Sequence, residues 1–353
     1  MIKSIYIHIP FCKTICTYCD FCKMYYKKEW VNSYLKELDK EFNKYYQKEL
    51  ISTIYIGGGT PSSLNKEELD ILFSTIKKIN LNKKYEFTFE CNIEDINEEL
   101  LIYLKNHKVN RLSIGVESFN NKILKTLGRP FQNINNILLA KQYFNNINID
   151  LIYGINNGTI KDLDKDLKSF IKLDISHISI YSLILEDNTI LKTNNYKEID
   201  PDLSRDMYER ICKVLKNNNY IHYEISNFSK KGYESLHNLT YWNNENYYGF
   251  GLGASGYIDN LRYTNTRSLT NYLKGNYRYE EDILNETITM ENEMILGLRK
   301  TKGVSKKDFY KKYNKHIKDV FNISKLNENK DYFYINENNL YISNTILQDF
   351  INI

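Results

Sequence analysis

The chain has 353 residues, 42% of them hydrophobic, which allows a sizeable core and favours one large domain with a smaller unit beside it. The net charge of +4 comes from 48 basic and 44 acidic residues spread along the chain, which indicates a solvated surface and argues against a nucleic-acid-binding stripe. No apolar run is long enough to span a membrane, and Met1 leads straight into a predicted strand, so we expect a cytoplasmic protein without a signal peptide or transmembrane segment.

Short β-rich runs alternate with stretches of helical spacing through the first half of the chain. Strands are predicted at residues 4–9, 53–56, 85–90, 111–115, 147–152 and 178–183. Such alternation is typical of βα units and predicts an α/β fold, either a parallel barrel or an open sheet. In the predicted helix over 30–46, four aromatic or aliphatic residues recur at every fourth position and predict one buried stripe: Trp30, Tyr34, Leu38 and Phe42.

Three cysteines follow the first predicted strand in the run FCKTICTYCDFC. Cys12, Cys16 and Cys19 are spaced three and then two residues apart. Three clustered thiolates suit a cubane iron-sulfur cluster and leave one iron open for an exchangeable ligand. The spacing therefore indicates that the cluster takes part in a reaction and does not only stabilise the fold.

Two other interpretations of the cysteines remain open at this point. Cys22 follows three residues after Cys19, so a closed zinc site is conceivable, although structural zinc sites usually pair two near and two distant ligands. A disulfide framework is disfavoured because six cysteines in 353 residues are sparse. We expect the isolated Cys91 and Cys212 to be small core residues.

Polar or glycine-rich segments follow the predicted strands where each strand ends. The cysteine run comes after the first strand, Gly57 to Pro61 after the second, Glu90 ends the third, Glu117 follows the fourth and Asp150 lies near the end of the fifth. In α/β barrels the carboxyl ends of the strands carry the active site. These residues are therefore predicted to converge on one catalytic or cofactor-binding site.

The glycine-rich turn permits a ligand to approach the backbone closely, and its amide groups can meet a carboxylate or phosphate. It lacks the spacing of a dinucleotide or nucleoside-triphosphate fingerprint. Glu90 ends the apolar strand FTFE, where burial of an acid is costly without a partner. A cationic amine would be a suitable partner.

The residues beyond Thr287 are predicted to form a separate small unit. Helices are expected at 290–299, 305–313 and 317–323, followed by a β-hairpin around Asn336 to Asn339 and a short final helix. Helices followed by a hairpin suggest a winged-helix shape. Because no basic stripe accompanies it, we expect a packing or docking lid and no nucleic-acid partner.

Taken together, these motifs resemble a known family. The segments YIHIPFC, GGGTPS, ECN, RLSIGVESF, LGR, IDLIYG and ISIYSL occur in order and resemble radical S-adenosylmethionine proteins of the coproporphyrinogen III oxidase-like branch. The resemblance runs from Tyr6 to the RKTKG region near Arg299. It implies a partial (β/α)6 barrel over residues 1–225, a connecting region over 226–286 and a small C-terminal α+β, winged-helix-like unit over 287–353.

The resemblance also implies the cofactors and their ligands. Cys12, Cys16 and Cys19 match the cysteines that hold a 4Fe-4S cluster, whose open iron binds the amine and carboxylate of S-adenosylmethionine. Further positions match residues that contact S-adenosylmethionine: Tyr6, Tyr18, Gly58, Gly59, Thr60, Glu90, Glu117, Arg129 and Asp150. Glu117 departs from the family, which usually has Gln there, so a group that donates hydrogen bonds is replaced by one that, when ionised, only accepts them. A sulfonium cation can still favour this carboxylate.

Within the branch, the oxygen-independent coproporphyrinogen III dehydrogenases carry a further cysteine two residues after the third, where this chain has Phe21. They also have a long segment before the cluster, whereas the first cysteine here is residue 12. HNLTYW, residues 237–242, resembles instead the HNxxYW motif of the heme chaperone family HemW, and GFGLGAS, residues 249–255, is shared with that family.

The HNLTYW resemblance implies that His237 ligates heme iron beside the apolar faces of Tyr241 and Trp242, although a histidine among aromatics is also a common packing residue. It further implies a chaperone that binds heme, the cluster and S-adenosylmethionine, receives electrons from a donor and passes heme to an acceptor protein. A decarboxylating porphyrinogen dehydrogenase and a metal-stabilised binding protein without radical chemistry stay as alternatives, so whether the chain is an enzyme is left open.

Overall fold

The computed structural model describes residues 2–351, and a parallel sheet of six strands lies at its centre. These strands are β1 (Ser4–Ile9), β4 (Ile51–Gly58), β5 (Leu81–Asn92), β6 (Arg111–Glu117), β7 (Asn146–Tyr153) and β8 (His177–Ser182). They lie side by side in chain order, each parallel to the next. All six predicted strands are therefore confirmed, several of them extended by a few residues.

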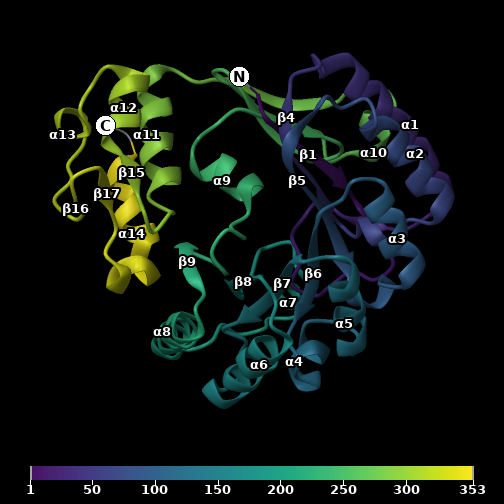
Figure 1. Ribbon diagram of the computed structural model, residues 1–353, viewed down its shortest axis with the longest axis horizontal. Helices are drawn as coiled ribbons and strands as arrows, with labels where there is room; N and C mark the ends of the chain where they lie inside the picture. Colours follow the sequence, from purple (N-terminus) through teal and green to yellow (C-terminus); the bar gives the residue numbers. More distant parts are fainter. Residues whose placement is uncertain (1, 352–353) are drawn as a thin grey trace.

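Helices connect these strands and cover the outer face of the curved sheet (Figure 1). They are α1 (Lys28–Tyr45), α2 (Lys66–Ile76), α3 (Glu98–Asn106), α4 (Asn121–Thr126), α5 (Ile134–Tyr143), α6 (Ile160–Leu173), α7 (Ile190–Thr193) and α8 (Pro201–Asn217), with short 3-10 turns η1 (Pro61–Ser63) and η2 (Ile93–Asp95). Helical crossovers between parallel strands place the carboxyl ends of the strands at one edge.

The predicted stripe of α1 is confirmed at three of its four positions. Tyr34, Leu38 and Phe42 are buried, whereas Trp30 is 38% exposed, so its assignment to the core is wrong. The buried stripe begins one residue later, at Val31, and the Trp30 ring lies under the ammonium group of Lys27 at 4.3 Å. In the first turn of a helix, a residue on the edge of the stripe can turn toward solvent.

Both edges of the six-stranded core are extended by later parts of the chain. On one side β11 (Tyr247–Phe250) runs parallel to β1, and β12 (Ser255–Ile258), β13 (Leu261–Asn265) and β14 (Arg278–Ile283) follow as an antiparallel meander. On the other side the hairpin of β9 (Ile221–Glu224) and β10 (Asn227–Ser229) pairs with β8. The result is one open sheet of twelve strands, not a closed barrel. Helices α9 (Leu236–Trp242) and α10 (Leu269–Leu273) belong to this same later stretch.

The C-terminal residues form a unit with its own small sheet, at the left of Figure 1. It contains α11 (Glu286–Gly297), α12 (Lys306–Tyr313), α13 (Ile317–Val320) and α14 (Ser343–Leu347), strands β15 (Val304–Ser305), β16 (Asn327–Glu328) and β17 (Tyr332–Tyr334), and the 3-10 turns η3 (Glu337–Ile342) and η4 (Gln348–Phe350). Strand β17 pairs with both β15 and β16.

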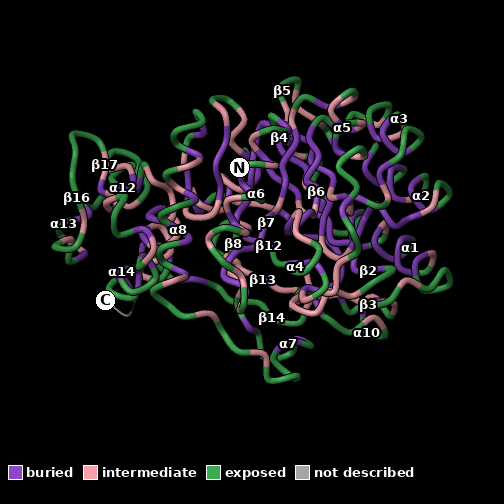
Figure 2. Tube along the Cα trace, turned by 90° about the horizontal axis from the view of Figure 1, so that it is seen from below, coloured by how far each residue is buried: buried purple, intermediate pink, exposed green. Residues whose placement is uncertain are grey.

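The hairpin predicted around Asn336 to Asn339 is wrong. The segment after β17 forms η3 because the Asn336 side chain caps it by accepting a hydrogen bond from Asn338 N, at 3.0 Å. The hairpin lies earlier, between β16 and β17. The third helix is also shorter than predicted and ends at Val320. In Figure 2 the buried residues concentrate in the large sheet and its covering helices.

Candidate functional site

The cysteine loop is fixed at both ends by a short parallel ladder. Strand β2 (Phe11–Cys12) pairs with β3 (Met24–Tyr25), and flanking backbone bonds run from Met24 N to Pro10 O (2.8 Å) and from Tyr26 N to Cys12 O (2.9 Å). The loop between the two strands therefore stands at the carboxyl end of β1. All six cysteines are free thiols, so the disulfide interpretation finds no support among the described residues.

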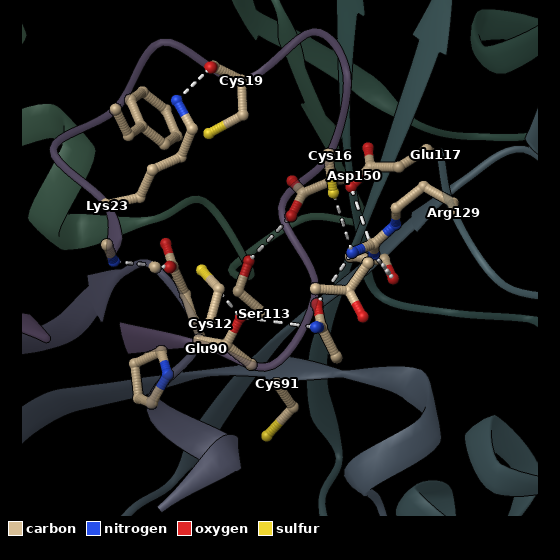
Figure 3. Close-up of a pocket in the computed structure, with 18 of the residues that line it drawn as sticks. Cys12, Cys16, Cys19, Lys23, Glu90, Cys91, Ser113, Glu117, Arg129 and Asp150 are labelled. Carbon is tan, nitrogen blue, oxygen red and sulfur yellow. Dashed lines mark hydrogen bonds and ion pairs between the residues drawn. The ribbon is translucent and has the colours of Figure 1, made fainter. Parts of the chain in front are cut away.

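Three of the four thiols of the cysteine loop border the pocket at the carboxyl edge of the sheet, and Cys91 of β5 lines it as well. Cys12, Cys16 and Cys19 line it, as Figure 3 shows. Cys22 does not line the pocket. It packs against Gly253 instead, where an added Cβ would lie 2.6 Å from the Cys22 Cβ and 3.0 Å from its sulfur. Burial raises the pKa of the Cys12 thiol to about 11, and it raises the pKa of Cys16 and Cys19 as well. Bound cations would be needed to keep these thiols ionised.

The separation of the thiols bears on the zinc interpretation. Among residues 2–351, no three side chains of His, Cys, Asp or Glu lie close enough together to hold one metal ion. A single zinc ion requires all its sulfur ligands at about 2.3 Å. A cluster presents irons at separate corners and suits ligands that are further apart. Three cysteines of one loop that border the same pocket are the ligand number that leaves one iron of a four-iron cluster open.

The glycine turn, Gly57 to Pro61, begins in the last residues of β4 and is packed so tightly that side chains are excluded at Gly57 and Gly59. A Cβ on Gly57 would lie 2.7 Å from the Glu90 carboxyl carbon, and one on Gly59 would lie 2.7 Å from the Pro10 carbonyl carbon and 2.9 Å from the Cys12 sulfur. Beside the turn, the Thr60 hydroxyl donates a hydrogen bond to Cys12 Sγ at 3.5 Å. The turn thus brings its backbone against both the cluster loop and the acid of β5.

Glu90 is held by two donors at the floor of the pocket. The Tyr55 hydroxyl donates to Oε1 at 2.7 Å, and the Gly58 amide donates to Oε2 at 2.9 Å. Burial raises the pKa of Glu90 to about 7, and the nearby charge of Asp150 adds to this effect. An incoming cation would favour the ionised carboxylate.

Glu117 and Arg129 form an ion pair on the wall formed by β6 and the loop after α4. Their closest atoms, Glu117 Oε1 and Arg129 Nη2, are 3.4 Å apart. The guanidinium also donates to Gly115 O at 2.6 Å and to Asn92 Oδ1 at 3.0 Å, and it lies 3.7 Å from Cys16 Sγ. Burial raises the pKa of Glu117 to about 7 even though the charge of Arg129 acts in the opposite direction. Arg129 Nε is buried without a hydrogen-bond partner, so one donor stays available at this wall.

Asp150 completes the acidic lining from β7. Its Oδ1 accepts a 2.8 Å hydrogen bond from Asn148, and its Oδ2 lies 3.4 Å from the Ser113 hydroxyl. Burial raises its pKa. Ser113 and Asn92 also line the pocket and were missed in the sequence. The available signal was the alternation along the strands, since Ser113 and Asn92 lie two residues from Gly115 and Glu90, which also line the pocket.

Tyr18 lines the pocket, whereas Tyr6 does not. The Tyr6 hydroxyl is hydrogen-bonded to His8 Nδ1 at 2.8 Å, and its ring lies 6.1 Å from that of Tyr55. Tyr6 therefore sits beside the residue that holds Glu90. Its predicted contact with the cofactor stays a prediction.

His237 is buried where α9 packs against β4; it does not line the cofactor pocket, although its ring lies 5.2 Å from that of Tyr55, which holds Glu90. His237 is 1% exposed, its Nδ1 is hydrogen-bonded to Thr53 Oγ1 at 2.9 Å and its Nε2 to the Tyr241 hydroxyl at 2.8 Å. Its backbone amide donates to Glu86 Oε1 at 2.9 Å. Thr53 and Glu86 are paired in the register of β4 and β5. In this geometry the imidazole connects α9 to the sheet, and binding heme iron would require one of its two hydrogen bonds to break.

A second cavity of about 350 Å³ adjoins the cofactor pocket and shares Tyr18, Cys19, Phe21, Glu90, Glu117 and Asp150 with it. Its outer rim is apolar, since Phe21 is 63% exposed and Ile184 is 66% exposed. The pocket with the thiols therefore opens toward a partly apolar surface.

The residues of the pocket fit the two cofactors that the sequence predicts. Three unpaired thiols of the cysteine loop border it, together with glycine backbone, three acids and a guanidinium. A methionyl moiety carries an amine and a carboxylate, for which Glu90 and Arg129 are chemically complementary. No helix among the described residues has both the length and the apolar character that crossing a bilayer requires.

Comparison with known proteins agrees with this site. The family model of the radical SAM superfamily matches residues 6–170. The heme chaperone HemW of Lactococcus lactis is 38% identical over 369 aligned positions, which cover 99% of this chain and 97% of that protein. The heme chaperone HemW of Bacillus subtilis is 40% identical over an alignment that covers 90% of this chain and 89% of that protein.

Among solved structures, the coproporphyrinogen III oxidase HemN of Escherichia coli has the same fold. It superposes with a TM-score of 0.86 at 19% identity, over 99% of this chain and 90% of its own. The predicted α/β radical SAM architecture is thus confirmed. The superfamily implies a 4Fe-4S cluster and S-adenosylmethionine as cofactors. The extent and identity of the curated matches show that the chain belongs to the HemW family of the radical SAM superfamily.

Proposed function

We propose that this chain is a heme chaperone, which binds heme, a 4Fe-4S cluster and S-adenosylmethionine and passes heme to an acceptor protein. Two HemW heme chaperones match it over 90% or more of its length. The observation that carries the proposal is the pocket in which three cysteine thiols face a glycine turn and Glu90.

In this proposal each pocket residue has a defined part. Cys12, Cys16 and Cys19 hold the cluster, which leaves one iron open and supplies an electron to the sulfonium of S-adenosylmethionine when both are bound. Glu90 accepts a hydrogen bond from the methionyl amine beside the Gly58 backbone. The other proposed cofactor contacts are Tyr6, Tyr18, Gly59, Thr60, Glu117, Arg129 and Asp150.

The experiment that tests the proposal is anaerobic reconstitution followed by heme titration. We expect a 4Fe-4S spectrum that S-adenosylmethionine perturbs, saturable heme binding, and transfer of heme to an apo-hemoprotein supplied in excess. A reconstituted protein that binds no heme would refute the chaperone. A spectrum that S-adenosylmethionine leaves unchanged would favour the binding protein without radical chemistry.

The second candidate is an oxygen-independent coproporphyrinogen III dehydrogenase. The superposition with HemN shows a shared fold only, because the two chains are 19% identical. Phe21 occupies the position at which those enzymes carry a further cysteine. It lines both the cofactor pocket and the adjoining 350 Å³ cavity and is 63% exposed. Formation of protoporphyrinogen from coproporphyrinogen III by the reconstituted protein would establish this candidate over the chaperone.

The remaining assignments are part of the same proposal. We place the protein in the cytoplasm, where cluster thiolates stay reduced. It requires an electron donor for the cluster and a heme acceptor. Residues 1–225 form the cofactor core, 226–286 connect it and 287–353 form a lid or docking unit that does not act on nucleic acid.

A further inference from the structure

A chain of hydrogen bonds runs from Asp150, at the wall of the cofactor pocket, into the buried interior of the protein. Asn148 Nδ2 donates to Asp150 Oδ1 at 2.8 Å, and the carbonyl oxygen of the same amide lies 2.6 Å from His177 Nδ1. The other ring nitrogen, His177 Nε2, lies 2.7 Å from the Tyr223 hydroxyl, whose oxygen accepts a bond from Ser235 N at 3.2 Å. Side chains from β7, β8 and β9 therefore connect a pocket acid to the N-cap of α9.

The sheet places these side chains together and away from water. Asn148 and Asp150 are two residues apart on β7 and so point to the same face, and the register pairs Asn148 with His177 of β8. Asn148 is 2% exposed, His177 is 0% exposed and Tyr223 is 8% exposed. A buried polar group that loses its partner is costly, so each of these side chains depends on its neighbours in the chain.

The direction of the bonds is fixed by the chemistry of their ends. A carboxylate only accepts, so the NH₂ group of Asn148 faces Asp150 and its carbonyl faces His177. That carbonyl also only accepts, so the ring proton of a neutral His177 lies on Nδ1, and Nε2 accepts from Tyr223. Burial lowers the pKa of His177 well below its usual value, and the charge of Arg111 adds to this effect, so the ring stays neutral. In this tautomer the ring keeps the donor end of the amide turned toward the pocket.

The Asn148 amide affects both the position and the charge of Asp150. Burial raises the pKa of Asp150, and the hydrogen bond from Asn148 acts in the opposite direction. The same Nδ2 donates to Ser113 Oγ at 2.8 Å, and the Ser113 hydroxyl lies 3.4 Å from Asp150 Oδ2, a long contact that Figure 3 shows. Because Asp150 and Ser113 both line the cofactor pocket, one buried amide holds two residues of its wall.

From this geometry we infer that Asn148, His177 and Tyr223 are positioning residues for S-adenosylmethionine, which act by holding the Asp150 carboxylate in place at the pocket wall. The inference rests on the proposed function, in which Asp150 contacts S-adenosylmethionine. None of the three lines the cofactor pocket, so their effect on the ligand passes through Asp150 and Ser113.

The first test is the tautomer of His177 in the full-length, reconstituted protein with an oxidised cluster. Nitrogen-15 NMR of labelled histidines distinguishes a ring protonated at Nδ1 from one protonated at Nε2, and the His177 signals are those that His177→Gln lacks. We expect a neutral ring with its proton on Nδ1 at neutral pH. A proton on Nε2 alone would overturn the inference, because the Asn148 amide would then present its carbonyl to Asp150.

The second test is the dissociation constant of S-adenosylmethionine, measured from the change that it causes in the electron paramagnetic resonance signal of the reduced cluster. His177→Phe removes the donor and the acceptor, His177→Gln retains one of each, and Tyr223→Phe removes the donor to Nε2. The matched controls are His222→Phe and Tyr220→Phe. Their hydrogen bonds go to the backbone oxygens of Ile225 and Ile175, and neither residue lines the cofactor pocket. Circular dichroism and iron content verify that each variant is folded and loaded.

We expect the dissociation constant to rise about tenfold in His177→Phe and about threefold in Tyr223→Phe, with unchanged iron content. His177→Gln should recover most of the affinity, which a loss of packing alone would not explain, and both controls should bind as the wild type does. Tyr223→Phe keeps the test decisive if His177→Phe does not fold. Wild-type protein that binds S-adenosylmethionine while neither variant differs from its control would overturn the inference and leave the proposed function intact. A wild-type cluster that S-adenosylmethionine does not perturb would refute both.

Discussion

The Tyr55 hydroxyl donates a 2.7 Å hydrogen bond to Oε1 of Glu90, and this contact joins two neighbouring parallel strands at the floor of the cofactor pocket. Tyr55 and Glu90 are 35 residues apart in the chain, yet the sheet register places them together. The bond favours the ionised carboxylate, which burial alone would disfavour. Tyr55 therefore positions and tunes a residue that we expect to meet the methionyl amine.

Tyr55→Phe is expected to weaken S-adenosylmethionine binding without loss of the cluster. A hydrogen bond to a charged group contributes about 1.5 to 3 kcal/mol, so we expect the dissociation constant to rise by roughly ten- to a hundredfold. The measurement is the change that S-adenosylmethionine causes in the electron paramagnetic resonance signal of the reduced cluster. Tyr279→Phe is the control, since Tyr279 is 78% exposed; equal affinities for the two variants would contradict the role of Tyr55.

The four cysteines of the loop are expected to separate into two classes. Cys16→Ser should lose most of the bound iron, because its thiol lines the pocket. Cys22→Ser should retain the 4Fe-4S spectrum, because Cys22 does not line the pocket. Iron and sulfide analysis after anaerobic reconstitution checks both. Loss of iron in Cys22→Ser comparable to that in Cys16→Ser would instead support a site with four protein ligands.

Two substitutions in the glycine turn, at Gly57 and Gly59, should fail in different ways. In Gly57→Ala the new methyl group would lie 2.7 Å from the Glu90 carboxyl carbon, so we expect weak S-adenosylmethionine binding with a normal cluster. In Gly59→Ala it would lie 2.9 Å from Cys12 Sγ and 2.7 Å from backbone, so we expect poor cluster loading. Iron content and S-adenosylmethionine titration, measured on both variants, distinguish the two effects. The same loss pattern in both variants would show a general collapse of the turn.

His237→Gln should reduce the sensitivity of the fold to acid. Burial lowers the pKa of His237 to about 3, and the charge of Arg111 adds to this effect. Between the unfolded pKa of about 6.5 and the folded value, only the unfolded chain takes up a proton, so stability falls as the pH falls. At pH 5 the histidine should cost about 2 kcal/mol of the free energy of unfolding relative to pH 7.5.

Urea unfolding of wild type and His237→Gln at the two pH values checks this expectation. The other histidines are shared by both proteins, so their titration cancels in the difference. A difference in unfolding free energy that does not change with pH would contradict a buried, neutral His237. Heme titration of the same variant at pH 7.5 also tests the predicted ligand, and unchanged binding would remove His237 from that role.

Much of this architecture is readable from the sequence because it depends on local patterns. The hydrophobic periodicity predicts the six strands. The order of the motifs along the chain then places the cysteine loop, Glu90, Glu117 and Asp150 at the strand ends, where they converge. Arg129 lies after a short helix, and its identification required the family resemblance.

Other features depend on three-dimensional packing that periodicity does not specify. The 3-10 turn at Asn336 replaces a hairpin because one side chain caps the backbone locally. The enclosure of His237 depends on Thr53 and Glu86, which are more than 150 residues away in the chain. The cavity bordered by α8, β9 and η3 depends on a tertiary contact between α8 and η3, which no sequence motif specifies.

The strands that flank the six-stranded core have a consequence for synthesis. Both of its outer strands, β1 and β8, pair with segments that follow residue 220 in the chain. A nascent chain that ends before residue 220 contains the six-stranded core, but β1 and β8 then have unpaired outer edges. Such edges promote aggregation until later strands cover them. The protein must therefore complete most of its length before the fold is protected, so a truncation near residue 220 removes this protection together with the later strands.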